Sequence, residues 1–136
     1  MAIIELESPL VFRHNVRPIC LPEKMETQVD KLADHAVILV GWGKQQSDSN
    51  DLTESYKNAQ LIVYHQARCN DSVRNSNGDI GYLIRQLLPR KFTDDLMCAG
   101  FYLGGIGSCF GDSGGPLLKK IYGNLLKYTY IWVTFP

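Results

Sequence analysis

A serine enclosed by glycines is the part of the sequence with the clearest chemical potential. Ser113 follows Gly111 and Asp112 and precedes Gly114 and Gly115. Glycine lets a backbone turn tightly and expose its own N–H groups. Such N–H groups can bind a developing oxyanion, and a serine hydroxyl beside them can act as a nucleophile if a base is near. On composition alone, however, a glycine-rich loop with one serine is more often a plain turn.

Short apolar segments between polar loops must position this serine. We expect strands over residues 2–6, 36–42, 59–64 and 125–135, because these segments are apolar and rich in β-branched or aromatic residues. Residues 44–55 are polar and predict a surface loop, and residues 82–88 can form two helical turns before Pro89. Short strands joined by loops favour an all-β fold.

Composition places the chain among ordinary globular proteins. It has 136 residues, of which 45% are hydrophobic, and 14 basic residues balance 14 acidic ones. This balance argues against a nucleic-acid partner. No apolar run approaches the roughly 20 residues of a membrane span, and the start lacks the basic region of a signal peptide.

The four cysteines stand far apart, at Cys20, Cys69, Cys98 and Cys109. Four cysteines allow three complete pairings, and spacing alone does not choose among them. No CxxC pair occurs, which argues against a zinc ribbon or a thioredoxin-type redox site. Spread-out cysteines favour an oxidising compartment, and we expect neither a metal ion nor another cofactor.

The string GDSGGPL at residues 111–117 resembles the signature of the trypsin-like serine proteases. Other anchors of that family follow in order, namely IIEL and SPL at residues 3–10, VRPICLP at 16–22, VGWG at 40–43, Cys69, and MCAG at 97–100. The resemblance implies an all-β, trypsin-like antiparallel β-barrel, the C-terminal half of a double-barrel domain that is incomplete at both ends. Residues 1–22 would be the last strand of the first barrel and the inter-barrel connection, and 23–136 the truncated second barrel.

The same resemblance implies roles for individual residues. Ser113 would be the nucleophile, and the N–H groups of Gly111 and Ser113 would form the oxyanion hole. Asp112 would accept the new N-terminal amine that zymogen cleavage creates in this family.

Specificity would depend on a pocket formed by Gly107, Ser108 and Phe110. Family members that cleave after Arg or Lys carry an aspartate six residues before the nucleophile, where this chain has Gly107. The resemblance therefore implies a pocket without a basic preference, which takes apolar side chains.

The resemblance also implies a pairing of the cysteines. Cys69 and Cys98 match a family disulfide, whereas the partner of Cys109 would lie beyond Pro136 and that of Cys20 before Met1. Cys20 and Cys109 would therefore be unpaired within this chain. A further bridge that many members carry is replaced here by Val37 and Lys119.

Two of the three residues of the family's catalytic triad have no counterpart. Neither the histidine of an Ala-His-Cys motif nor the aspartate that would fall next to Met1 is present. None of the three histidines, His14, His35 and His65, matches the family's base, and we expect all three at the surface. We likewise expect Glu5, Asp94 and Asp95 to be solvated charges.

Two functions remain open at this point. The first is a fragment of a secreted serine-type endopeptidase, extracellular, which acts on protein or peptide substrates and needs its missing N-terminal barrel or pro-segment as a partner. The alternative is a non-catalytic homologue that serves as a binding or regulatory module.

We predict that this chain alone has no measurable peptidase activity, because the base and its orienting acid are absent. Incubation with peptide and ester substrates tests this prediction. Hydrolysis that disappears in the Ser113→Ala variant would contradict it.

Overall fold

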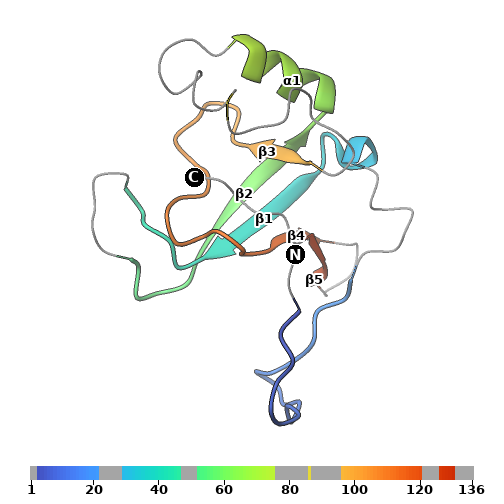
Figure 1. Cartoon of the computed structure of the whole chain (residues 1–136), viewed down its shortest axis with the longest axis vertical. Helices are drawn as coiled ribbons and strands as arrows, with labels where there is room; N and C mark the ends of the chain where they lie inside the picture. Colours follow the sequence, from blue (N-terminus) through green and yellow to red (C-terminus); the bar gives the residue numbers. More distant parts are fainter. Residues whose placement is uncertain are drawn as a thin grey trace.

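One antiparallel sheet organises the chain (Figure 1). The computed structural model describes residues 3–21, 29–46, 52–75, 86, 96–120 and 126–130. Its five strands lie in the order β3-β2-β1-β4-β5. A short 3-10 helix precedes β1 and one α-helix follows β2, and the elements are η2 (Val29–Leu32), β1 (Ala36–Gly41), β2 (Lys57–Tyr64), α1 (Gln66–Asn75), β3 (Cys98–Gly100), β4 (Leu117–Lys120) and β5 (Leu126–Tyr130). The expected antiparallel all-β architecture is confirmed.

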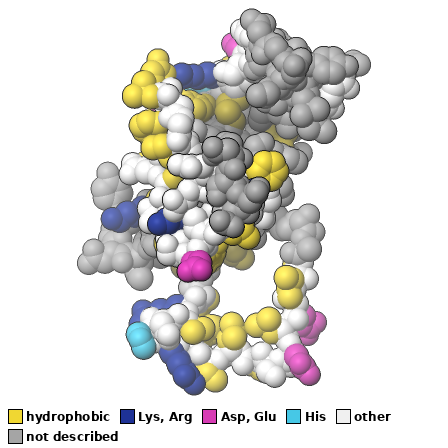
Figure 2. Space-filling view, turned by 90° about the vertical axis from the view of Figure 1, so that its left-hand side faces the viewer, with side chains coloured by type: hydrophobic (Ala, Val, Ile, Leu, Met, Phe, Trp, Pro, Cys, Tyr) yellow, Lys and Arg dark blue, Asp and Glu magenta, His cyan; other side chains and the backbone are white. Residues whose placement is uncertain are grey.

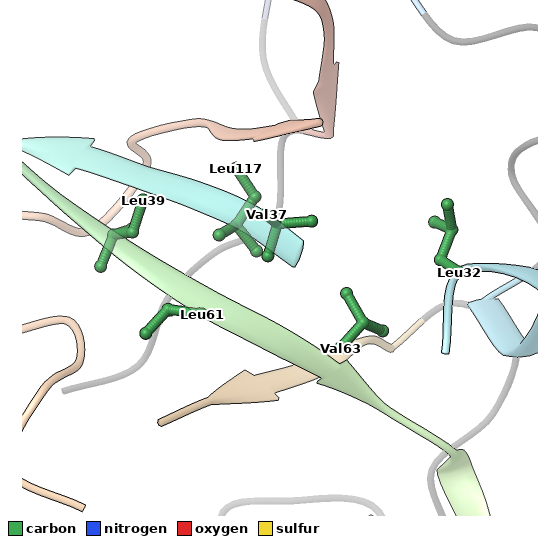
Figure 3. Packing of buried hydrophobic residues seen from close by; sticks show 6 residues of the cluster. All are labelled: Leu32, Val37, Leu39, Leu61, Val63 and Leu117. Carbon is green, nitrogen blue, oxygen red and sulfur yellow. The ribbon is translucent and has the colours of Figure 1, made fainter. Parts of the chain in front are cut away.

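The hydrophobic core lies over the two central strands. Side chains alternate between the faces of a strand, so Val37 and Leu39 of β1 point to the same side. Val37 pairs directly with Leu61 of β2. Burial of such a side chain stabilises the fold by about 1.5–3 kcal/mol. Figure 3 shows the cluster, which consists of Leu32, Val37, Leu39, Leu61, Val63 and Leu117.

The central strands were predicted well and the first segment was not. Strands β1 and β2 confirm the expectations for residues 36–42 and 59–64, and β5 confirms part of the segment 125–135. The strand expected over residues 2–6 is wrong for residues 3–6, which form no strand. No described strand lies beside them, and a strand needs a neighbour for its backbone hydrogen bonds. Of the helix expected over residues 82–88, only Gln86 lies within the described residues, and it is helical.

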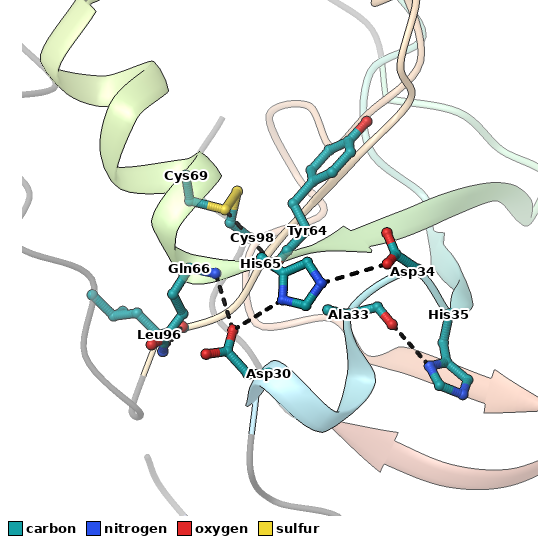
Figure 4. A network of polar contacts seen from close by, with 10 residues as sticks. All are labelled: Asp30, Ala33, Asp34, His35, Tyr64, His65, Gln66, Cys69, Leu96 and Cys98. Atoms are coloured by element: carbon teal, nitrogen blue, oxygen red, sulfur yellow. Dashed lines mark hydrogen bonds and ion pairs between the residues drawn. A yellow bond between two sulfur atoms is a disulfide. The ribbon is translucent and has the colours of Figure 1, made fainter.

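Helix α1 was missed because its stability comes from distant residues. Its sequence is polar, and it begins where the Asp30 carboxylate accepts a hydrogen bond from the Gln66 N–H at 3.1 Å (Figure 4). An aspartate oxygen on a free N–H at a helix start acts as an N-cap, although this one comes from η2. Cys69 of α1 also forms a disulfide with Cys98 of β3. The hydrogen bond and the disulfide stabilise α1 in place of an apolar pattern or a capping residue next to it in the sequence.

Many members of the resembled family carry a disulfide between the strands that correspond to β1 and β4. This chain has Val37 and Lys119 at the two positions instead of cysteines. Ile38 pairs with Leu118 and Leu39 with Leu117. Extension of this register by one residue places Val37 opposite Lys119. Val37 is fully buried in the core, so packing of a valine takes the place of a covalent link between β1 and β4.

The N-terminal arm, residues 3–21, extends away from the sheet (Figures 1 and 2). Its one β-bridge joins Arg13 and Val16. Large apolar side chains are exposed along it, with Ile3 at 96% and Ile4 at 85%, and also at Leu6, Leu10, Val11, Phe12, Ile19 and Leu21. Large exposed apolar patches are unusual in monomeric proteins and are typical of interaction sites.

We predict that Leu61→Ala lowers the free energy of unfolding by about 2–5 kcal/mol, because it leaves a cavity between β1 and β2. Urea denaturation followed by tryptophan fluorescence measures this change. Leu103→Ala is the matched control, since Leu103 is 81% exposed, and should change stability by less than about 0.5 kcal/mol. Equal losses in the two variants would contradict the described core.

Candidate active site

A tight turn precedes Ser113. The Asp112 N–H donates to the Cys109 carbonyl at 3.0 Å, which closes a four-residue turn. Its third residue, Gly111, has a φ of 97°. A positive φ at the third position identifies a type II turn, where glycine is favoured because other residues are strained. The glycine before Asp112 is therefore required by the backbone geometry.

The peptide between Phe110 and Gly111 has a fixed orientation. The Phe110 carbonyl accepts a hydrogen bond from the Lys44 N–H at 2.8 Å. Lys44 belongs to the segment that follows β1. This peptide is trans, so the N–H of Gly111 points opposite to the Phe110 carbonyl. The Gly111 N–H is thereby directed away from the segment that follows β1.

A second turn contains Ser113 itself. The Gly115 N–H donates to the Asp112 carbonyl at 2.9 Å, and Gly114, the third residue of this turn, has a φ of 81°. Ser113 occupies the second position and is exposed. Two successive type II turns thus present the serine on the surface, two residues after Gly111.

The Asp112 carboxylate lies beneath these turns. Its Oδ1 accepts a hydrogen bond from the Gly43 N–H at 2.8 Å, and its Oδ2 accepts one from the Cys109 N–H at 3.0 Å. A Cβ built on Gly41 or on Gly43 would overlap this carboxylate. The two glycines around Trp42 are therefore needed so that Asp112 can reach the end of β1, a contact that sequence reasoning missed.

A cavity of about 260 Å³ opens beside the carboxylate. Asp112 is the acidic residue among those that line it, and Lys44 and Lys57 are the basic ones. The cavity brings together Asp112 and Gly107, but Ser108 and Phe110 do not line it. The remaining lining residues are small, apolar or amide side chains, namely Leu39, Gly41, Gly43, Gln45, Asn58, Ala59, Gly105 and Ile106.

Phe110 lies outside this cavity, at the surface. Its side chain is 59% exposed, and the Lys44 ammonium lies over its ring at 5.7 Å from the centroid. This cation–π contact adds to the backbone hydrogen bond between the same two residues. Lys44 therefore contacts both the ring and the carbonyl of the residue that precedes Gly111.

Two of the cysteines form the disulfide that the resemblance implied. Cys69 and Cys98 form a disulfide, which is confirmed. Cys20 is free and exposed, and Cys109 is free and half-buried. Cys109 still takes part in the site through its backbone, because its N–H and carbonyl both bond to Asp112.

Two of the histidines lie at the far end of the sheet. His65 directly follows β2, and its ring nitrogens lie 3.8 Å from Asp30 Oδ1 and 3.5 Å from Asp34 Oδ2 (Figure 4). His35 precedes β1, and its Nδ1 is 3.1 Å from the Ala33 carbonyl. The site lies at the opposite ends of these strands, roughly 25 Å away along β2 at the usual rise per residue. Neither ring is placed to take a proton from Ser113.

The third histidine, His14, belongs to the N-terminal arm, and Glu5 there is exposed. Asp94 and Asp95 lie outside the described residues. Within the described part of the chain, no group of three or more His, Cys, Asp or Glu side chains could hold a metal ion, and no helix is long and apolar enough to cross a bilayer.

The family of the chain is shown by its sequence similarity to known proteins. A sequence profile of the family described as Trypsin matches residues 1–122, which includes the two turns, Ser113 and both glycines around Trp42. The chain belongs to the trypsin family.

Similar proteins come from Carcinoscorpius rotundicauda, Tachypleus tridentatus and Mus musculus. The chain is 30% identical over 118 residues to "Limulus clotting factor C" of Carcinoscorpius rotundicauda, which covers 87% of this chain and 10% of that protein. It is 34% identical to "Clotting factor G beta subunit" of Tachypleus tridentatus, over 88% of this chain and 36% of that protein. It is 31% identical to "Transmembrane protease serine 11C" of Mus musculus, over 88% of this chain and 24% of that protein. This trypsin-family chain thus spans about a tenth to a third of these relatives.

We predict that Gly111→Ala lowers the free energy of unfolding by about 1–3 kcal/mol, because alanine is strained at a positive φ. The added Cβ would also lie 2.6 Å from Leu52 Cδ2. Urea denaturation measures the change. Gly107→Ala is the matched control, since nothing lies within 4 Å of its added Cβ, and equal stability of the two variants would contradict the type II turn.

Proposed function

We propose that the chain is part of a serine endopeptidase in which Ser113 is the nucleophile and the N–H groups of Gly111 and Ser113 form the oxyanion hole. The observation that carries this proposal is the pair of type II turns. They expose Ser113 and direct the Gly111 N–H away from the segment that follows β1. Removal of one such donor costs about 2.7–4 kcal/mol of transition-state stabilisation in enzymes of this type.

The reaction would proceed through an acyl-enzyme. Ser113 Oγ attacks the scissile carbonyl while a base takes its proton, and the resulting oxyanion accepts hydrogen bonds from the two N–H groups. The base then donates that proton to the leaving amine, and water hydrolyses the ester on Ser113. The base and its orienting acid are contributions of a longer protein, since no histidine here matches the family's base.

The proposed longer protein would also cover the N-terminal arm. The arm exposes eight large apolar side chains along residues 3–21, and the resemblance assigns residues 1–22 to the last strand of a first barrel and the connection to the second. Packing against that barrel would remove the apolar surface from water. The Cys69–Cys98 disulfide supports an extracellular location, because disulfides persist in oxidising compartments.

Asp112 would control the hole in this proposal. A new N-terminal ammonium would enter the cavity beside the carboxylate and pair with it, which would stabilise the turn between Cys109 and Asp112. The substrate pocket near Gly107 would favour a non-basic side chain, because Gly107 replaces the aspartate that selects Arg or Lys in the family.

We predict that a product extended upstream through an Ala-His-Cys motif and an aspartate hydrolyses peptide substrates, and that Ser113→Ala lowers its kcat by about six orders of magnitude. Steady-state assays of the extended protein measure this loss. Ser72→Ala on α1 is the control and should retain full activity. An extended protein with an intact triad but no activity would favour the non-catalytic binding module instead.

A further inference from the structure

We propose that Arg68 is a positioning residue for substrate binding, because its guanidinium anchors the loop that leads from β3 to Gly107. The inference rests on the proposed endopeptidase function, in which Gly107 belongs to the specificity pocket. It adds a residue of α1, outside that pocket, to those that determine how tightly an apolar substrate side chain is held.

The guanidinium of Arg68 contacts two aromatic rings. Its Cζ lies over the Tyr64 ring at 4.6 Å from the centroid and over the Tyr102 ring at 5.2 Å. Both distances fall within the roughly 6 Å of a cation–π contact, and the planar guanidinium is suited to stacking on aromatic faces. Arg68 of α1 thus connects the end of β2 with the loop that follows β3 (Figure 1).

The side of this contact that includes Tyr64 is fixed by the sheet and the disulfide. Tyr64 is the last residue of β2 and pairs with Cys98 of β3. Cys98 is bonded to Cys69, the neighbour of Arg68 on α1. The guanidinium therefore projects from backbone that strand pairing and a covalent bond both hold in place.

In the described loop after β3, the side that includes Tyr102 has weaker support. Tyr102 is 72% exposed, so burial does not fix its ring. The backbone hydrogen bond described within residues 101–107 is a local one, from the Gly104 N–H to the Phe101 carbonyl at 2.9 Å. This bond sets the shape of the turn around Tyr102 but not the place of that turn on the molecule. The contact with Arg68 fixes that place.

The same loop continues into the candidate active site. Residues 105–107 line the cavity. Nothing beyond the chain neighbours lies within 4 Å of a Cβ built on Gly105 or on Gly107, so close packing on that side does not hold these residues. The place of Gly107 then follows from the two ends of the loop. One end is Tyr102, and the other is Cys109, whose N–H and carbonyl both form hydrogen bonds within the site.

Loss of the Arg68 contact would affect substrate binding more than the chemical step. The turns around Ser113 are held separately, by hydrogen bonds to the Asp112 carboxylate. A mobile Gly107 would instead hold the substrate side chain before the scissile bond less tightly. A contact that is lost equally from the bound substrate and from the transition state raises KM and leaves kcat unchanged.

Nuclear magnetic resonance relaxation of the 136-residue chain tests the anchor without any need for activity. We expect Arg68→Met to lower the backbone order parameters of residues 103–107 from near the roughly 0.85 of rigid backbone towards the values below about 0.6 of flexible segments. Tyr102→Leu should give the same loss, and the double variant should give no further one. Tyr102→Phe is the matched control, since it retains the ring. Unchanged order parameters in both Arg68→Met and Tyr102→Leu would overturn the proposal.

Steady-state kinetics of the extended protein test the consequence for substrates. For a peptide with phenylalanine before the scissile bond, we expect Arg68→Met to raise KM roughly threefold, as for loss of an exposed cation–π contact, and to leave kcat unchanged. Asp71→Asn, which removes a charge from an exposed residue of α1, is the control and should keep the native KM. An unchanged KM in an Arg68→Met protein whose loop is mobile would refute the role in substrate binding.

Failure of the proposed function would be visible separately. An extended protein that is inactive in its native form would refute the endopeptidase function. Residues 103–107 that are rigid in the native chain and mobile in Arg68→Met would still support the anchor.

Discussion

Two backbone amides from distant parts of the chain converge on the Asp112 carboxylate, and the geometry around Ser113 depends on this contact. One amide belongs to Gly43, 69 positions away in the sequence, and the other to Cys109 in the same loop. A hydrogen bond to a charged group contributes about 1.5–3 kcal/mol, more than a neutral one. The carboxylate therefore fixes the loop of the serine against the end of the central strand.

Strand β1 connects the stability of the fold with the geometry of the site. Its first half carries Val37 and Leu39, which pack in the core. Its end, Gly41, lies against the Asp112 carboxylate, and the residues just beyond it donate to Asp112 and to the Phe110 carbonyl. A shift of β1 by one residue would turn its core side chains outward and would also move both amides. Core packing and the orientation of the Gly111 N–H are thus set by one strand register.

Local sequence signals were sufficient for some parts of this structure. The apolar runs predict β1 and β2 because burial follows directly from composition there, and the glycines around Ser113 indicate a tightly turned, exposed loop. The resemblance pairs Cys69 with Cys98, and the structure has that bond.

Other parts depend on residues far apart in the sequence and could not be predicted from it. Helix α1 needs the Asp30 carboxylate at its start, and residues 3–6 lack a neighbouring strand among those described. The contact of Asp112 with Gly41 and Gly43 is also long-range. The sequence indicates this contact locally only by two glycines, two positions apart, after an apolar run. Side chains at such positions point the same way, so two glycines there leave room on one side of the chain.

The dependence of α1 on distant residues has a consequence for the order of folding. Asp30 is 36 positions from Gln66, and the two cysteines of the disulfide are 29 apart. These contacts require the intervening loops to close and bring η2 and β3 to the start of the helix. A short polar helix is also unstable in isolation. Helix α1 should therefore form only when η2 and β3 are in place beside it, and a thiol reductant present during folding would remove one of its two ties while leaving the pairing of β1 with β2 unaffected.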